Sequence, residues 1–255
     1  MHDVSVSAEV WVTDDGAMTI PVARLAKLLA DDTRATFCTA LLDGRAWTAG
    51  ELAHHAGVAA STATAHLSLL VEGGLLTEER QGRHRYVRLA GPHAAQLLED
   101  LAAYSADPLP TPRTLRAHNA NQALVFARTC YDHLAGRLGV AVTDALTSKG
   151  LLRQDTGFAL TDEGKTWFGT VLSIDLTAPS RRPMARACLD WTERRTHLAG
   201  TSGAALCRTL LNRDWLVRVG STRALRLTPA GEQAMAEVFG MSELERTGRP
   251  PSSAC

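Results

Sequence analysis

The chain has 255 residues, of which 45% are hydrophobic and 21% charged, and its 27 basic side chains balance 27 acidic ones. This composition predicts a soluble globular protein with one large domain or two small ones. No apolar run is long enough to cross a bilayer and the first residues lack the form of a signal peptide, so we expect a cytoplasmic protein with no membrane partner. Zero net charge is weak evidence against a nucleic-acid binder, because a local basic patch can contact phosphates.

Five cysteines occur in the chain, an odd number without a close C-x-x-C pair. They are Cys38, Cys130, Cys188, Cys207 and Cys255. In a reducing compartment this pattern predicts free thiols rather than a disulfide framework.

The first hundred residues predict a series of short helices followed by a hairpin. Residues 1–20 carry few periodic signals and predict a loose strand or arm. A helical pattern covers residues 21–30, and a second helix, capped by residues 31–33, covers 34–42 and ends at Gly44. Thr48 is placed to cap a third helix that Gly57 ends.

A fourth helix and a hairpin follow. Ser61 is placed to cap this helix, and Gly73-Gly74 ends it. A strand opens at Leu75-Leu76, a turn falls at Gln81-Gly82, and a second strand returns through Tyr86. Helix, turn, helix and hairpin in this order are typical of a winged helix-turn-helix, whose second helix enters the major groove of DNA.

The tip of this hairpin is basic. Its cationic candidates are Arg80, Arg83, His84, Arg85 and Arg88. A solvated β-turn is the alternative, since basic turns are common. The patch gains weight because it follows the two helices at the spacing of a wing.

From about Leu25 to Tyr104 the chain resembles the ArsR/SmtB family of winged-helix repressors. The matching motifs are Asp32-x-Arg34, Leu41-Leu42, Glu51-Leu52-Ala53, Gly57-Val58-x-x-Ser61-Thr62-x-Thr64-x-His66-Leu67-x-x-Leu70, Gly73-Gly74-Leu75-Leu76 and Gly82-Arg83-x-x-Tyr86. The resemblance implies a bacterial homodimer that docks through its first and last helices and binds a palindromic operator. The chain departs from the family's metal sensors, which often carry a Cys-x-Cys box where it has Glu51 to His55. His54 and His55 are adjacent and point about 100° apart on a helix, which favours a solvated or DNA-facing surface over a metal site.

The recognition helix begins with small hydroxyl side chains, which suit close approach to a groove. It lacks Arg, Lys, Asn and Gln before its end, so we expect modest direct base specificity with a contribution from DNA shape. The predicted DNA-contacting residues are Thr48, Ser61, Thr62, Thr64, Ala65, His66, Ser68, Arg83, His84 and Arg85. Arg83 and Arg85 are predicted to meet the backbone or minor groove. The alternative for His66 is a surface position without DNA contact.

An internal repeat marks the second half. The tetrapeptide His133-Leu-Ala-Gly returns at His197, each copy is preceded by a cysteine, and a later L-T-x-x-G occurs in both. We interpret this as two winged-helix-like units, each built of two helices and a hairpin. The proline-containing segment 105–113 precedes them and predicts an interdomain linker.

Cysteine and histidine of the two repeats are candidate metal ligands. Cys130 and His133, three residues apart, would share one helical face, and Cys188 and His197 supply the same groups in the second repeat. Two such half-sites facing each other would form a four-ligand cage for a metal ion, the one cofactor that the sequence suggests. Structural buried thiols are the alternative, and a small-molecule or redox site is a third.

Other side chains suggest weaker functional hypotheses. Aromatic residues are candidates for an organic-ligand pocket or for plain core: Trp167, Phe168, Trp191 and Trp215. Four arginines suggest an anionic ligand or DNA, with solvated charge as the default: Arg182, Arg186, Arg194 and Arg195. The chain has no Gly-rich phosphate loop, G-x-S-x-G elbow or H-E-x-x-H, so we expect no enzyme.

The expected fold is mainly α with small β-hairpin wings. The predicted parts are an arm (1–20), a winged helix-turn-helix (21–104), a linker (105–116), a C-terminal α+β effector and dimerisation domain of two repeats (117–246) and a disordered tail (247–255). The expected function is a homodimeric, sequence-specific transcriptional regulator, in the first instance a repressor, of double-stranded operator DNA. Its effector, a small molecule or ion, would bind at Cys130, His133, Cys188, Trp191 or His197. The alternatives are a metal- or thiol-responsive sensor and a winged-helix protein-interaction module.

Overall fold

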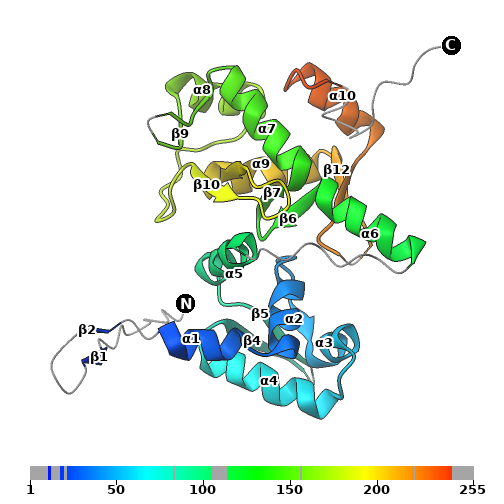
Figure 1. The fold of residues 1–255 in the computed structure, drawn as a ribbon. Helices are drawn as coiled ribbons and strands as arrows, with labels where there is room; N and C mark the ends of the chain where they lie inside the picture. The colour runs from blue at the N-terminus through cyan, green and yellow to red at the C-terminus, as the bar shows by residue number, and fades with distance from the viewer. Residues whose placement is uncertain are drawn as a thin grey trace. The chain divides into compact units, whose positions relative to one another are not determined.

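The computed structural model describes residues 11–12, 18–19, 22–82, 84–104, 114–155, 157–220 and 222–242 (Figure 1). The chain divides into two compact units, Met1–Thr39 with Trp47–Val87 and Ala40–Ala46 with Arg88–Cys255. Most of the predicted arm and linker, and the whole tail 247–255, lie outside the described residues, so the predicted domain boundaries stay predictions. In the part that is described, no helix is long and apolar enough to cross a membrane.

The first unit is a winged helix. Its elements are α1 (Val22–Leu29), α2 (Asp32–Leu41), β3 (Trp47–Thr48), α3 (Ala49–Ala56), α4 (Ala60–Glu72), β4 (Leu76–Gln81) and β5 (His84–Leu89). They follow a short pair, β1 (Trp11–Val12) and β2 (Met18–Thr19). Strand β5 is hydrogen-bonded to both β3 and β4, so the hairpin is tied to the strand that leads into α3. The predicted order of helix, turn, helix and wing is confirmed.

The predicted caps are confirmed for α3 and wrong for α4. The Thr48 hydroxyl accepts the Glu51 N–H, the Glu51 carboxylate accepts the Thr48 N–H, and Gly57 ends α3 with φ 68°. Helix α4 begins two residues earlier than expected, with Ala59 at the N-cap, because the Ala59 carbonyl already accepts the Ala63 N–H at 3.0 Å. Ser61 therefore lies inside the first turn.

The second unit repeats one sequence of elements twice. It opens with α5 (Pro92–Tyr104) and α6 (Leu115–Phe126). The first repeat is β6 (Arg128–Cys130), β7 (His133–Ala135), α7 (Gly136–Ser148), β8 (Leu152–Arg153), β9 (Ala159–Leu160) and α8 (Asp162–Thr170). The second is β10 (Arg186–Leu189), β11 (Thr196–Ala199), α9 (Gly200–Asn212), β12 (Leu216–Arg218), β13 (Leu225–Leu227) and α10 (Pro229–Glu237). Each repeat is hairpin, helix, hairpin, helix, so the expectation of two helices before one hairpin is wrong.

The two repeats interlock around a shared core. Helix α7 packs on β11 of the second repeat, and α9 packs on β7 of the first. The Thr143 hydroxyl of α7 accepts the Leu198 N–H of β11 at 2.9 Å. Apolar side chains from both repeats form one buried cluster, which includes Leu138, Leu146, Phe168, Leu206, Leu210 and Met235. The first hairpin of each repeat is thereby held against its counterpart.

The turn from hairpin to helix requires glycine in both repeats. Gly136 has φ 81° and Gly200 has φ 86°, a left-handed backbone that glycine adopts without steric cost. A Cβ at Gly136 would lie 2.8 Å from the Val125 carbonyl oxygen, and one at Gly200 would lie 2.6 Å from that of Pro183. The glycine of each HLAG motif thus ends a strand at a point where the chain packs closely against the backbone of another segment.

Candidate functional site

The exposed face of α4 carries the residues predicted to meet DNA. Ser61, Thr62, Thr64 and Ala65 are exposed, whereas Ala63, Leu67 and Leu70 are buried. The Thr64 hydroxyl donates to the Ala60 carbonyl at 2.9 Å, so it bonds within its own helix. Ser68 is half-buried. The outward face of the first two turns is therefore small and uncharged, and the role of these residues in DNA contact stays a prediction.

His66 and Thr48 make contacts inside the first unit. An Arg34 guanidinium nitrogen lies 3.2 Å from His66 Nδ1, and Asp31 Oδ1 lies 3.6 Å from the same nitrogen. His66 therefore ties α4 to the junction between α1 and α2. The Thr48 side chain is engaged in the α3 capping box, which positions α3 before α4.

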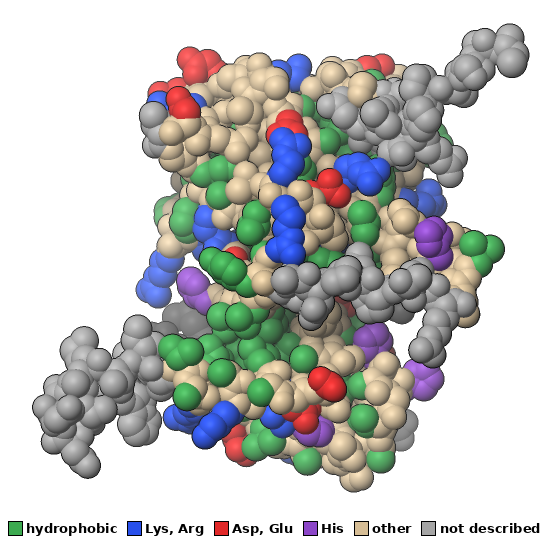
Figure 2. All heavy atoms as spheres, in the orientation of Figure 1, with side chains coloured by type: hydrophobic (Ala, Val, Ile, Leu, Met, Phe, Trp, Pro, Cys, Tyr) green, Lys and Arg blue, Asp and Glu red, His purple; other side chains and the backbone are tan. Residues whose placement is uncertain are grey.

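The wing carries charges of both signs. Arg85 of β5 forms an ion pair with Glu78 of β4, and Arg80 is exposed. Arg83 and the His84 side chain lie outside the described residues. On the face drawn in Figure 2, basic and acidic side chains are interspersed rather than gathered by sign. Phosphate contacts by the wing would therefore depend on a few arginines rather than on a broad positive surface.

The four predicted metal ligands lie together in the second unit. Cys130, His133, Cys188 and His197 are all buried, and one ligand atom from each lies within 4.8 Å of the others. The sulfurs of Cys130 and Cys188 are 3.7 Å apart, and the Nε2 atoms of His133 and His197 are 3.1 Å apart. In the described part of the chain this is the one such group of three or more possible ligands.

Strand pairing, not a helix, brings each cysteine to its histidine. Cys130 pairs with His133 across the β6–β7 turn, and Cys188 pairs with His197 across β10–β11. Directly opposed residues in a hairpin point to the same face, so each hairpin presents one thiol and one imidazole. The expectation that Cys130 and His133 share a helical face is wrong. A spacing of three also fits a tight hairpin, which Tyr131 permits with φ 58°.

A carboxylate stands behind each imidazole. Asp132 Oδ1 lies 3.2 Å from His133 Nδ1, and Asp190 Oδ2 lies 3.7 Å from His197 Nδ1. The sequence placed Asp190 near the second half-site but did not predict an aspartate behind each imidazole. A signal exists, because Arg128-x-Cys130-x-Asp132 returns as Arg186-x-Cys188-x-Asp190. The second copy has six more residues between aspartate and histidine, which hides the correspondence.

The two thiols differ in acidity. A hydrogen bond from the Cys130 thiol, with contributions from His133 and His197, lowers the pKa of Cys188 to about 2 although burial opposes it. Burial and the same thiol pairing raise the pKa of Cys130 well above its usual value. Burial acts to lower the pKa of His133, but hydrogen bonds to Asp132 and Cys188 raise it above its ordinary value.

Two other buried cysteines show what a structural thiol looks like in this protein. Burial raises the pKa of Cys38 to about 12 and that of Cys207 to about 12. Neither belongs to a group of possible metal ligands among the described residues. Cys188, whose pKa is lowered, thus differs from these two buried thiols, and Cys130 differs from them by its place in the cluster.

The remaining candidate residues pack or pair with protein groups. Phe168 is buried in the core of the second unit, and Trp167 and Trp215 pack against it. The Arg128 guanidinium lies 4.7 Å from the centre of the Trp191 ring, so Trp191 covers a buried cation rather than the ligand atoms. The four candidate arginines each donate to a protein group. Arg182 bonds to Asp132, Arg186 to Gln96, Arg194 to the Ala103 carbonyl and Arg195 to Asp144.

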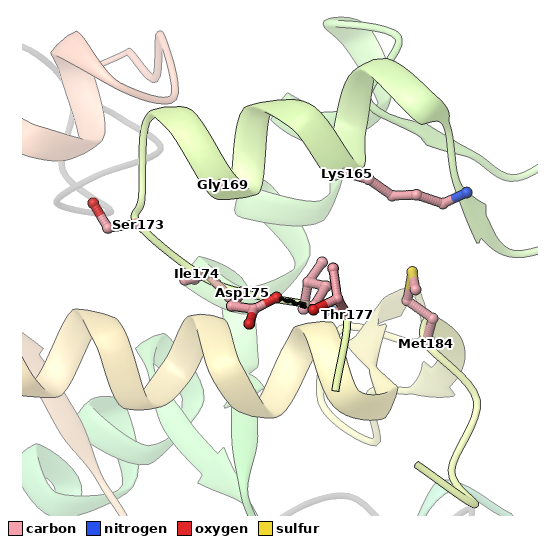
Figure 3. Close-up of a pocket in the computed structure, with 8 residues that line it drawn as sticks. Lys165, Gly169, Ser173, Ile174, Asp175, Thr177 and Met184 are labelled. Carbon is pink, nitrogen blue, oxygen red and sulfur yellow. Dashed lines mark hydrogen bonds between the residues drawn. The ribbon is translucent and has the colours of Figure 1, made fainter. Parts of the chain in front are cut away.

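Cavities of very different size lie in the second unit. One of about 580 Å³ lies between α8 and the segment 173–184 and contains none of the predicted site residues (Figure 3). Its Asp175 carboxylate accepts the Thr177 N–H and hydroxyl at 2.8 and 2.7 Å. Another, of about 10 Å³, touches Cys130 and His133 and holds at most an ion or a single water. The cluster therefore has no room for an organic ligand.

The first unit, with a helix-turn-helix followed by a wing, has the architecture of a DNA-binding transcriptional regulator. A helix-turn-helix domain family matches residues 29–79. The uncharacterized HTH-type transcriptional regulator YdfF of Bacillus subtilis is 40% identical over 215 residues, covering 84% of this chain and 94% of its own. Because that alignment leaves out only about a sixth of this chain, it includes most of the second unit. The chain belongs to the HTH-type transcriptional regulators of the ArsR/SmtB type.

Other relatives match a smaller part of this chain. CmtR, an HTH-type transcriptional regulator of Mycobacterium tuberculosis, is 41% identical over 80 residues, which are 31% of this chain and 67% of CmtR. A solved structure of CmtR, described as a cadmium metal-sensor, is 36% identical and covers 37% of this chain and 99% of that chain, with a TM-score of 0.29. The alignment with CmtR thus covers under a third of this chain, whereas that with YdfF covers 84% of it.

Proposed function

We propose that the protein is a homodimeric transcriptional repressor that binds operator DNA through α4 and the wing, and whose affinity is set by an effector bound in the second unit. The observation that carries the proposal is the outward face of α4. Its first two turns expose Ser61, Thr62 and Ala65, while the opposite face is buried in the first unit. A helix with this face free can enter a major groove without steric obstruction by its own side chains.

Exposed apolar residues on two helices support a dimer. Val22 of α1 is 61% exposed, and Leu101 and Tyr104 of α5 are 48% and 86% exposed. These helices are the first and last of the region resembling the family, and the resemblance implies docking through them. We propose that a second copy of the chain packs against these side chains. Light scattering at micromolar protein should then give twice the monomer mass.

A charge placed on α4 tests the DNA-binding role. Thr62→Glu adds a negative charge in the first turn, where it favours the helix dipole but repels phosphates. We expect at least tenfold weaker binding to the DNA upstream of the gene, measured by fluorescence anisotropy against a scrambled duplex. Thr166→Glu, at an exposed helical threonine of the second unit, is the matched control and should bind normally. Equal affinity of the unmodified protein for operator and scrambled DNA would contradict the proposal.

Two alternatives remain distinct outcomes of the same work. If the winged helix is a protein-interaction module, the unmodified protein binds no DNA and Thr62→Glu changes nothing. If the effector is a metal ion or an oxidant, operator affinity changes with added ion or with reductant. The buried cluster of two cysteines and two histidines favours this metal- or thiol-responsive form of the regulator.

A further inference from the structure

We infer that the cluster in the second unit binds one divalent metal ion of the zinc class, and that this ion joins the first hairpins of the two repeats. Its ligands are Cys130, His133, Cys188 and His197. The inference supplies the effector class that the proposed function leaves open, and rests on that function only for its effect on DNA binding. Both cysteines bind the ion as thiolates, so any proton that a ligand still carries is released to solvent, and no oxidation state changes.

The ligand atoms stand at the separations of a tetrahedral site. Zinc–sulfur distances of about 2.3 Å and zinc–nitrogen distances of about 2.05 Å place two sulfurs about 3.8 Å apart and two nitrogens about 3.3 Å apart. The cysteine sulfurs here are 3.7 Å apart, and the histidine Nε2 atoms are 3.1 Å apart. These two separations differ from those of a tetrahedral site by about 0.1–0.2 Å, and the other pairs of ligand atoms lie within 4.8 Å of one another.

The imidazoles are oriented for an ion between them. Each turns Nδ1 toward an aspartate, which leaves Nε2 facing the other imidazole. Carboxylate, histidine and metal in a line is the usual second-shell arrangement at zinc. Among the described residues His197 Nδ1, a buried atom, has no hydrogen-bond partner. An ion at Nε2 would polarise this N–H and strengthen its attraction to Asp190.

The donor set selects the kind of ion. Two sulfurs and two imidazole nitrogens suit zinc, cadmium or cobalt and do not suit calcium or magnesium, which prefer oxygen ligands. Four protein ligands leave no open position, so the site is closed rather than hydrolytic. The adjoining void of about 10 Å³ excludes an organic ligand.

A disulfide between the two cysteines explains less of the site. A disulfide needs sulfurs about 2.05 Å apart, well inside the 3.7 Å separation here. It would also leave two buried histidines facing one another without a role. Four converging donors with two carboxylates behind them are accounted for by an ion.

The site adjoins the segments that flank the helix-turn-helix in the chain. Gln96 of α5 lies 3.9 Å from the Cys188 sulfur, and α5 follows the wing strand β5 directly. The Tyr131 N–H, in the turn between two ligands, donates to the Leu42 carbonyl at 3.2 Å, in the segment that leads to β3. Ion binding can therefore shift both segments by acting on one pair of hairpins.

The test is metal content and the spectrum of the cobalt form of the full chain. Protein purified without chelator should hold one zinc per chain. The apo form titrated with Co²⁺ should develop thiolate charge-transfer and tetrahedral d–d bands that saturate at one equivalent. Cys188→Ala and His197→Ala should each lose the tetrahedral spectrum. Cys207→Ala removes an equally buried thiol outside the cluster and should keep it.

Several outcomes would overturn the inference. One is an unmodified protein that is free of metal as purified and gives no cobalt bands at one equivalent. Another is an unchanged cobalt spectrum in Cys188→Ala. A third is quantitative loss of two thiols in metal-free protein, which indicates the disulfide. The cobalt bands do not depend on DNA, so a metal-binding protein that ignores its operator overturns the proposed function and leaves the site intact.

Discussion

The two ligand hairpins carry the same donors but differ in what lies behind them. In the first, Asp132 is 28% exposed and its partner Arg182 is 31% exposed. In the second, Asp190 and Arg128 are both fully buried, and the guanidinium donates to both carboxylate oxygens at 2.9 Å. The comparison indicates that the carboxylate of the second hairpin is held by a fully buried ion pair, whereas that of the first is partly open to solvent.

The buried carboxylate also organises backbone. Asp190 accepts the Gly136 N–H at 2.7 Å from the other repeat, as well as the Thr192 N–H and hydroxyl at 2.9 and 2.7 Å. Burial acts to raise the pKa of Asp190, but the Arg128 cation and these donors hold it well below its usual range. Asp190 therefore stays ionised at any pH where the protein is folded.

Removing the buried carboxylate should have the largest effect. Asp190→Ala leaves the Arg128 charge buried and unpaired, which costs about 3–5 kcal/mol of unfolding free energy. Asp144→Ala breaks the exposed pair with Arg195 and should cost at most about 1 kcal/mol. Urea unfolding monitored by tryptophan fluorescence measures both. Equal losses in the two variants would show that the hairpins do not differ as described.

Removing the ion should have the next largest effect. If the cluster binds zinc, free ion at 100 times its dissociation constant stabilises the fold by about 2.7 kcal/mol. Thermal melts with zinc and with chelator should therefore differ for the unmodified protein and coincide for Cys188→Ala. A chelator effect of the same size in Cys188→Ala would place the ion elsewhere.

Changing the carboxylate of Asp132 should lower the affinity for the ion without unfolding the protein. Asp132→Asn keeps the shape but orients His133 less well, so ion affinity should fall by about 10- to 100-fold. The pair with Arg182 is half-buried, but the amide oxygen of asparagine can still accept a hydrogen bond from the guanidinium, so stability should change by about 1 kcal/mol or less. Competition with a chromophoric chelator gives the affinity, and Asp144→Asn is the control. Unchanged affinity would remove Asp132 from the second shell.

Removing the contact between Gln96 of α5 and the Cys188 sulfur should have the smallest effect. Gln96→Ala removes the side chain that touches Cys188 while leaving all four ligands in place. We expect unchanged ion affinity and a change of about 0.5–2 kcal/mol in the coupling between ion and operator binding. Anisotropy titrations with and without zinc measure it, with Gln233→Ala on α10 as the control. An unchanged coupling would assign the link to Tyr131 and Leu42 instead.

Local signals predicted the winged helix well and the second unit less well. Thr48, Glu51 and Gly57 fix α3 by capping chemistry that needs no tertiary information. The repeated HLAG and its cysteines predicted which four residues to group, but not the strands that bring them together. A three-residue spacing fits both a helix and a hairpin, and strands of three or four residues are too short for periodicity to decide.

Partners distant in the chain could not be predicted. Asp190 depends on Arg128, 62 positions away, and the six-residue difference between the two hairpins shifts one half of the repeat against the other. The N-cap of α4 at Ala59 rather than Ser61 could not be predicted from side chains, because a backbone hydrogen bond from the Ala63 N–H begins the helix without a capping side chain.

The interlocked repeats let a single polypeptide supply all four ligands of the proposed cage. Capture of an ion at such a cage is unimolecular in protein, so the ion level that half-fills it does not depend on how much regulator the cell contains. Each subunit of a dimer would load on its own, and a Hill coefficient near one is expected for loading. The dose at which the regulator responds would then be a property of the fold and would not drift with its expression.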